Sequence, residues 1–235
     1  MKLLAIETAT EACSVALWID GDVRERYAIA PRRHAELALP WADALLAEAG
    51  IAKSQLDAIA VGRGPGAFTG VRLAIALAQG IALALDRPVV AVSTLAALAM
   101  QSEGARIIAA IDARMGEIYL GTFARDADGL VVAIDAEWLA RPDAVASPEG
   151  DYWFGVGSGF AADDGTLVKT LGDRLLRHDA AVLPHAADVV RLAARAWANG
   201  EAVAPELAEP AYLRDKVALT LAEQLASRTT SRDSR

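Results

Sequence analysis

One segment of the chain, Thr69 to Leu85, is apolar on almost every side if it folds as a helix. Ala and Gly alternate there with Leu and Ile, directly after a glycine-rich turn. A helix without a polar face must be buried on all sides, or buried on one side and covered by a partner protein on the other. Small residues also let neighbouring backbones approach closely. The segment therefore predicts a core helix or an interface helix within a larger fold.

The composition is that of a folded, acidic protein. A chain of 235 residues with 54% hydrophobic and 23% charged residues is too apolar to be disordered, and its length suits one large domain or two small ones. The formal charge of −8 argues against a free-standing basic nucleic-acid-binding module. The longest apolar run, Leu73 to Leu85, stops at Asp86, short of the roughly 20 residues of a membrane span. We expect a soluble protein without such a span.

Cysteine usage and the start of the chain predict a cytoplasmic location. Cys13 is the single cysteine, so no internal disulfide can form, which suits a reducing compartment. The opening MKLLAIETAT lacks the longer apolar stretch and cleavage site of a secretory signal. Cys13 as a nucleophile is the alternative to a buried small hydrophobe, and a lone cysteine within CSVALWI favours the buried role.

The first hundred residues predict a compact block of strands and helices. Apolar segments at Leu3–Ile6, Cys13–Ile19 and Val23–Ile29 read as strands, and Asp20-Gly21 between the last two is a strong hairpin signal. A helix is expected at His34–Ala49, ended by Gly50. Further elements are expected as strands at Ala58–Gly62 and Val89–Val92 and as helices at Thr69–Leu85 and Thr94–Gln101.

A second block begins after Ser102-Glu103-Gly104, so we expect domains at residues 1–103 and 104–226, with a disordered polar tail at 227–235. Strands are predicted at Arg106–Asp112 and Glu117–Phe123, and a helix at Ala186–Ala198. Residues 125–172 are rich in Asp, Gly and Pro and support no assignment.

Two turns carry candidate anion-binding groups. In ETATEA, the hydroxyls of Thr8 and Thr10 and nearby backbone N–H groups can donate to a phosphate; the alternative, which spacing alone favours, is an ordinary hairpin. In GRGPGAFTG, Gly64 and Gly66 allow a sharp bend before a helix N-terminus. This is neither a P-loop nor a dinucleotide fingerprint. Its plainer interpretation is a strand-to-helix turn that brings two elements close together.

Other catalytic constellations are missing from the sequence. His34, His178 and His185 form no metal-binding pair, and His34 is better explained as a polar contact at a helix start. No G-x-S-x-G elbow supports a serine hydrolase. Asp112 ends a predicted strand, where catalytic carboxylates often lie, but a strand-ending Asp is also a common turn former.

Six stretches together carry a family resemblance: ETATEACSVAL, PRRHAELALP, AVGRGPGAFTGVRLAIALAQGIA, PVVAVSTLAALA, IDARMGEIYLGTF and PAYLRDKVA. In this order the chain resembles the bacterial TsaB (YeaZ) family, with the GPGAFTGVR block the most specific part. The resemblance implies an α/β fold of the actin/Hsp70/sugar-kinase (ASKHA) superfold, with two subdomains that each hold a mixed sheet flanked by helices.

The resemblance also implies a function in forming N6-threonylcarbamoyladenosine at position 37 of ANN-decoding tRNAs. The catalytic paralogue TsaD binds a metal through two histidines, and Thr94 and Leu98 stand at the matching positions of this chain. We therefore expect a non-enzymatic scaffold that pairs with TsaD, works with the ATPase TsaE, forms a homodimer in isolation and meets tRNA only through the complex. No cofactor is expected for this chain, while an ATP site at the complex or between the subdomains stays open.

Carried over residue by residue, the resemblance implies two sets of site residues. The two helices that follow the hairpin and the glycine turn would form the homodimer and TsaD interfaces. Contact residues are then expected at His34, Leu37, Trp41, Leu45, Arg72, Leu73, Leu77 and Ile81, and a vestigial phosphate site at Thr8, Thr10, Gly64 and Gly66.

Two alternative functions compete with the scaffold. One is an independent ATPase or small-molecule kinase of the same superfold, which would use Thr8, Thr10 and Asp112 with Mg-ATP. It needs a second phosphate loop and an adenosine pocket, and the sequence displays neither. A metallopeptidase is the more distant alternative, because no residue set here could form its metal site.

Overall fold

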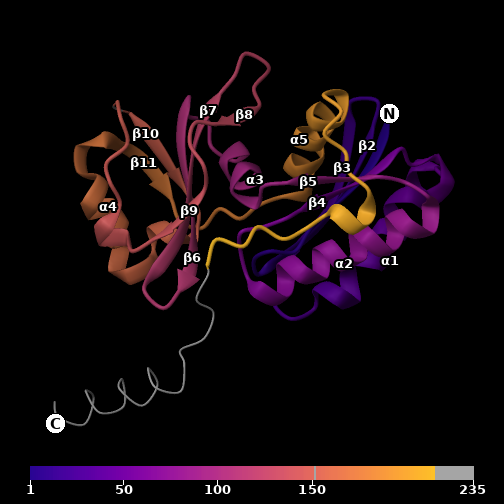
Figure 1. Ribbon diagram of the computed structural model, residues 1–235, viewed down its shortest axis with the longest axis horizontal. Helices are drawn as coiled ribbons and strands as arrows, with labels where there is room; N and C mark the ends of the chain where they lie inside the picture. Colours follow the sequence, from indigo (N-terminus) through magenta and orange to yellow (C-terminus); the bar gives the residue numbers. More distant parts are fainter. Residues whose placement is uncertain (151, 215–235) are drawn as a thin grey trace, which may run out of the picture.

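The computed structural model describes residues 1–150 and 152–214, which form two halves lying side by side (Figure 1). The tail predicted at 227–235 and the end of the second predicted domain lie outside the described residues.

The first half is built on a mixed five-stranded sheet of order β3-β2-β1-β4-β5. The three strands β1 (Lys2–Glu7), β2 (Ala12–Ile19) and β3 (Asp22–Ile29) are antiparallel, and β4 (Ala58–Gly62) and β5 (Val89–Val92) run parallel to β1. The predicted hairpin is confirmed: its central residues, Asp20 and Gly21, have φ of 49° and 108°, the left-handed geometry that an Asp-Gly turn favours.

Helices α1 (His34–Ala49) and α2 (Phe68–Leu85) cover one face of this sheet (Figure 1). The predicted end of α1 is confirmed by Gly50, which adopts φ 66° and closes the helix by hydrogen bonds to Ala47 and Leu46. The start of α2 lies one residue before the predicted Thr69. Apolar strand residues that alternate toward this face form the core beneath both helices, among them Leu4, Ile6, Val15, Ile59 and Val61.

The second half has a sheet of order β11-β10-β6-β7-β8, with β9 paired to β7. Its strands are β6 (Arg106–Arg114), β7 (Glu117–Arg125), β8 (Val131–Ala133), β9 (Trp138–Ala140), β10 (Trp153–Val156) and β11 (Leu175–Asp179), with helix α4 at Thr166–Leu171. Residues 125–172, for which the sequence supported no assignment, therefore contain three strands of this sheet and helix α4.

The two sheets repeat one topology. In each, the first strand pairs antiparallel with the second and parallel with the fourth, and the fifth extends the parallel side. Thus β6, β7, β8, β10 and β11 correspond to β1, β2, β3, β4 and β5. The second half has no counterpart of α1; β9 and a 3₁₀ turn at Pro142–Ala144 take its place in the chain.

The halves exchange helices across a shared core. Helix α3 (Thr94–Met100) follows the first sheet but contacts β6, β7 and β8, and α5 (Ala186–Ala198) follows the second sheet but packs on β1, β2 and β4 (Figure 1). One buried cluster contains Leu3 and Ala60 together with Ile107 and Phe123. The sheets do change at the predicted boundary near residue 103, but α5, which we assigned to the second domain, belongs by packing to the first.

Candidate functional site

Helix α2 is buried on one side only. Its inward residues include Ala74, Ala78 and Ala82, which are fully buried against the sheet. On the opposite side Ala76, Gly80 and Leu83 are exposed, at the spacing of one helical stripe, and Leu83 keeps 62% of its surface. Of the two solutions that an all-apolar helix allows, the chain therefore adopts burial on one side with an apolar stripe left on the other.

The predicted contact residues divide by burial. Leu37, Trp41, Leu73, Leu77 and Ile81 are half-buried along the margin between the core and this surface. The prediction of Leu45 as a contact residue is wrong. Leu45 is only 2% exposed because it faces the sheet, so it belongs to this chain's own core.

Three exposed residues were missed: Phe68, Leu83 and, on α1, Leu39. A helical-wheel count from the buried Ala residues would have placed Leu83 on the outer side. We call Phe68, Leu73, Ala76, Leu77, Gly80 and Leu83 of α2, together with Leu39 and Trp41 of α1, the outer helix face.

Among the described residues, α2 is also long and apolar enough to cross a membrane by length and composition, with a mean hydropathy of 1.7 over 18 residues. Because the inward side of α2 forms part of the core below the first sheet, the helix is an integral element of this fold.

Arg72 lies at the N-terminal end of the outer helix face. Its guanidinium stacks 3.3 Å from the centroid of the Phe68 ring and 5.1 Å from that of Tyr212. It also donates a hydrogen bond of 2.9 Å to the Tyr212 hydroxyl. A residue near the end of the described chain thereby joins the predicted interface helix.

His34 makes the polar contact that was expected of a helix start. Its Nε2 lies 3.0 Å from the carbonyl oxygen of Thr10, which ties the beginning of α1 to the β1–β2 turn.

The β1–β2 turn uses part of its hydrogen-bonding capacity within the chain. The Thr8 hydroxyl is buried and donates 2.8 Å to the carbonyl of Gly70, while the Thr10 hydroxyl accepts from Ala12 N at 3.3 Å. The Ala9 N–H donates 2.6 Å to the Glu7 carboxylate. The donors of Thr8 and Ala9 are thus committed to the chain's own groups, whereas Thr10 serves there as an acceptor and its side of the turn faces the cavity.

The glycine turn packs directly on the β1–β2 turn. A Cβ at Gly66 would meet the Ala9 carbonyl oxygen at 2.5 Å, and one at Gly70 would meet the Thr8 carbonyl oxygen at 2.0 Å. Gly64 is buried beneath Val71 and lies away from any anion site. The interpretation of this turn as a close approach of two elements is confirmed, and the role of Gly64 and Gly66 in a phosphate site is not supported.

Thr94, one of the two positions that the resemblance matches to the paralogue's histidines, forms a buried pair with Glu7. The Thr94 hydroxyl bonds Glu7 Oε2 at 2.9 Å and accepts from Gly64 N at 3.1 Å, and Leu98 is fully buried. Burial raises the pKa of the Glu7 carboxyl from 4.5 to about 7, although the hydrogen bonds from Ala9 and Thr94 lower it. Sequence reasoning missed this network; the signal was an acidic residue ending an otherwise apolar strand.

No group of three or more His, Cys, Asp or Glu side chains that could hold a metal occurs within residues 1–150 and 152–214. His178 stacks on Phe160, and His185 bonds Glu25 at 2.9 Å. Burial raises the pKa of the Cys13 thiol to about 11, with a smaller contribution from Glu7, so Cys13 is the buried small residue that was expected rather than a nucleophile.

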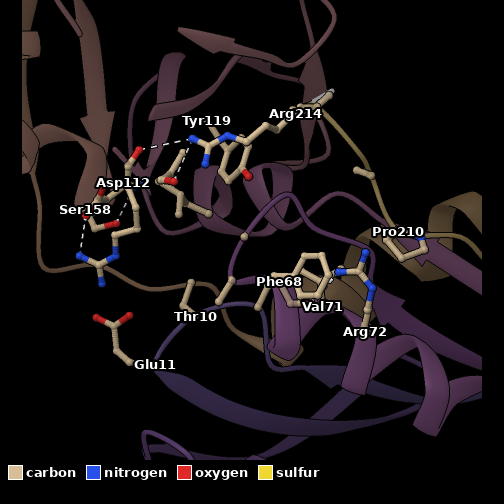
Figure 2. A pocket seen from close by; sticks show the side chains of 18 of the residues that line it. Thr10, Glu11, Phe68, Val71, Arg72, Asp112, Tyr119, Ser158, Pro210 and Arg214 are labelled. Carbon is tan, nitrogen blue, oxygen red and sulfur yellow. Dashed lines mark hydrogen bonds and ion pairs between the residues drawn. The ribbon is translucent and has the colours of Figure 1, made fainter. Parts of the chain in front are cut away.

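A cavity of about 910 Å³ separates the two halves (Figure 2). It brings together five residues that were singled out from distant stretches of the sequence: Thr10, His34, Gly66, Arg72 and Asp112. Thr8 and Gly64 do not line it. The backbone N–H of Asp112 donates 3.1 Å to Ser158 Oγ, and the Asp112 carboxylate accepts from Arg114 N and pairs with the Arg114 guanidinium at 2.9 Å.

The β6–β7 turn therefore repeats the β1–β2 turn: each has a carboxylate that binds backbone N–H groups of its own turn. Of the three residues that the kinase alternative would use, Thr10 and Asp112 line the cavity between the two turns and Thr8 does not.

Residues 210–214 form one wall of the cavity and were not anticipated as part of a site. Figure 2 shows Pro210 on the side of Arg72 and Arg214 beside Tyr119, on the other half. The sequence signal was the PAYLRD stretch, which entered the argument only through the resemblance.

Known proteins match this architecture over nearly its whole length. The family model described as "TsaD: tRNA N6-adenosine threonylcarbamoyltransferase" matches residues 28–221. The Escherichia coli (strain K12) protein named "tRNA threonylcarbamoyladenosine biosynthesis protein TsaB" is 43% identical over 225 residues, which cover 93% of this chain and 96% of the relative. The chain belongs to the TsaB family. A relative of the same name from Haemophilus influenzae is 36% identical, over 92% of this chain and 95% of its own.

Solved structures agree with the TsaB assignment. A structure described as "YeaZ from Pseudomonas aeruginosa" superposes with a TM-score of 0.84 at 47% identity, covering 90% of this chain and 99% of its own. A second, described as an uncharacterized protein with similarity to peptidase YEAZ from the same organism, has the same TM-score and identity. The expected ASKHA-type α/β fold, with two mixed sheets flanked by helices, is confirmed.

Proposed function

We propose that this chain is a non-catalytic subunit in the biosynthesis of threonylcarbamoyladenosine in tRNA. The outer helix face docks the TsaD homologue of the same cell, and the ATPase TsaE joins the assembly. The tRNA is reached through the complex, in line with a charge of −8 on this chain. In isolation the same face pairs two copies of the chain. The location is cytoplasmic, and the chain requires no cofactor of its own.

The observation that carries the proposal is the uncovered side of α2. Phe68 and Leu83 expose 61% and 62% of their surface, and Leu39 of the neighbouring α1 exposes 44%. The small residues Ala76 and Gly80 between them leave room for a second helix to approach closely, since nothing lies within 4 Å of the Cβ position at Gly80. An apolar face of this kind, ringed by half-buried Leu and Trp, is typical of a protein interface.

The absence of catalysis is supported by the Glu7–Thr94 pair. Thr94 and Leu98 fill the positions that the paralogue uses for its two metal-binding histidines, and both are fully buried. The Thr94 hydroxyl is already committed to Glu7 and Gly64. Because Thr94 and Leu98 supply no imidazole at these two positions, the paralogue's histidine pair has no equivalent there, and we assign the chemistry of the complex to the partner.

The test is a pull-down with the TsaD homologue, using Leu83→Glu and Gly80→Glu. Both positions are exposed, and Glu is a better helix former than Gly, so the monomer should fold normally. We expect a loss of at least tenfold in affinity, because a carboxylate would be desolvated at the centre of the interface. Leu176→Glu, at a 57% exposed position of β11, is the matched control and should bind as the wild type does.

Wild-type affinity of both α2 variants would overturn the interface. ATP turnover by the chain alone, abolished by Asp112→Asn, would instead establish the ATPase alternative. Flotation of the purified chain with liposomes, lost in Leu83→Glu, would assign the face to a lipid surface. A loss of TsaD binding without either result supports the scaffold.

A further inference from the structure

The last twelve described residues, Val203–Arg214, which we call the strap, run along the first half and then cross to the second (Figure 1). The strap begins at the free edge of the first sheet, where Val203 and Val89 exchange two backbone hydrogen bonds of 2.9 Å. Ala208 is buried in the core beneath α2, and its carbonyl accepts 3.1 Å from the side chain of Gln79. This end of the strap is therefore part of the first half.

The middle of the strap is attached to both arms of the glycine turn. The Ala211 N–H donates 2.8 Å to the carbonyl of Arg63, at the start of the turn GRGPGAFTG. The Tyr212 hydroxyl accepts from Arg72, just after this turn. These contacts hold residues 210–214 along the wall of the cavity between the two halves.

The far end of the strap is held by its own Arg214 side chain, which bonds the β6–β7 turn of the second half. Arg214 Nη2 donates 3.1 Å to the Ala113 carbonyl, 3.3 Å to the Arg114 carbonyl and 2.6 Å to Glu117 Oε2. The Arg214 side chain is only 15% exposed, so the ion pair with Glu117 is partly shielded from water. Arg114 and Met115 adopt positive φ in this turn, and Arg214 donates to two of its carbonyls.

The shared core of α3 and α5 joins the halves at one side of the cavity, and the strap joins them at another. We propose that the strap is a releasable tether: while Arg214 is seated on the β6–β7 turn the cavity stays at its present width, and unseating Arg214 lets the halves open about their shared core. The tether operates in the isolated chain and does not depend on the proposed partner.

The experiment measures the distance across the cavity in the full-length protein. The labels are placed by Ala35→Cys, next to the cavity-lining His34 of α1, and by Ala161→Cys, which lines the cavity from the other half; both positions are exposed. Spin labels attach only there, because the native Cys13 is 0% exposed. Double electron–electron resonance should give one narrow distance distribution for the tethered protein. Arg214→Ala and Glu117→Ala, which cut the same ion pair from its two ends, should each broaden the distribution and move it to longer distance.

Arg174→Ala is the matched control, since Arg174 donates to the Pro148 carbonyl within the second half alone. It should leave the distribution unchanged. Thermal unfolding by circular dichroism verifies that each variant is folded at the temperature of the measurement. A distribution that Arg214→Ala and Glu117→Ala leave as narrow and as short as in the wild type overturns the tether, as does equal broadening by Arg174→Ala.

Discussion

The two halves of the molecule share a strand order but differ in what covers their outer faces. Helices α1 and α2 cover the first sheet, and α2 keeps an apolar stripe exposed. Within the described residues the second half shows no counterpart of α1, and its outer face packs Trp153 and Phe160 against the short α4. These two large side chains are buried under α4, whereas Phe68 and Leu83 of α2 stay exposed. A duplicated sheet can therefore carry an exposed apolar helix face on one copy and a covered one on the other.

The turns after the first strand of each half form a second comparison. In the first half Gly66 and Gly70 press on Ala9 and Thr8, and in the second Gly157 lies against Ala110. Both turns also hold their own carboxylate. Glu7 is fully buried, whereas the Asp112 side chain is 26% exposed and paired with Arg114.

The largest expected loss of stability comes from adding a side chain at the glycines where two elements approach closely. In Gly70→Ala the new Cβ would lie 2.0 Å from the Thr8 carbonyl oxygen, and backbone cannot move aside cheaply. We expect a loss of about 3 kcal/mol in the free energy of unfolding, measured by urea denaturation. Gly157→Ala, at 2.4 Å from the Ala110 carbonyl oxygen and with φ 102°, should lose as much. If only one of the two is destabilised, the turns are not equivalent.

Gly80→Ala is the control within the same helix. Nothing lies within 4 Å of its Cβ, so the substitution should stabilise α2 by about 0.5–1 kcal/mol through helix propensity alone.

The buried carboxylate of the first half should give the protein a stability that falls as pH rises. The folded pKa of Glu7, about 7, lies above its unfolded value of 4.5, so the folded state binds the extra proton between these values. The loss is complete above pH 7 and amounts to at most about 3 kcal/mol. Glu7→Gln, whose amide can accept from Ala9 and donate to Thr94, should remove this dependence and be more stable than the wild type at pH 8.

Denaturation curves at pH 5, 6, 7 and 8 measure this effect. Asp112→Asn keeps Glu7 and should retain the wild-type slope. A Glu7→Gln curve parallel to that of the wild type would mean that Glu7 is ionised throughout, and the contrast between the two carboxylates would then disappear.

The smallest expected change in stability concerns the hydrogen bonds between the start of α5 and the first sheet. Helix α5 has no side-chain cap of its own; Glu25 accepts from Ala187 N and His185, and Ser14 accepts from Ala186 N. The hydrogen bond that His185 donates to Glu25 raises the pKa of His185; burial and Arg191 oppose this, and Asp188 adds to it. This stabilisation is present below the unfolded value of 6.5 and is lost as pH rises through the higher folded value.

Glu25→Gln should therefore cost about 1 kcal/mol at pH 6 and less at pH 9, measured by thermal unfolding. Ser14→Ala removes the other cap without a titrating partner, and its cost of about 1 kcal/mol should be the same at both pH values. Equal pH dependence of the two variants would exclude a role for the His185 charge.

Much of the fold could be predicted because local signals agree with tertiary packing in the first half. β4, β5, α1 and α5 have the bounds that apolar runs, Gly50 and helical periodicity indicated. The segment 125–172 could not be assigned, since its strands are three or four residues long and its helix six. Elements this short are stabilised by neighbours in the sheet rather than by their own periodicity.

The candidate site was predicted less well. The outer helix face followed from the composition of α2, but burial of Leu45 and exposure of Leu83 depend on which side of each helix meets the sheet. The predicted phosphate site divides for a similar reason: hydroxyls and glycines permit anion binding, and only the packed turns reveal that the Thr8 hydroxyl already donates to Gly70 while Thr10 faces the cavity.

The sequence by itself determined that α2 needs cover on every side, because Ala, Leu and Ile leave it no polar face, and that the chain resembles the TsaB family. The tertiary structure decided how that cover is divided: the sheet covers one side, and the other side stays exposed. It also decided that α5 packs on the opposite half and that Arg214 reaches Glu117 across the cavity. These contacts join residues nearly a hundred or more positions apart, and no local propensity specifies them; they form because the duplicated sheets share one core.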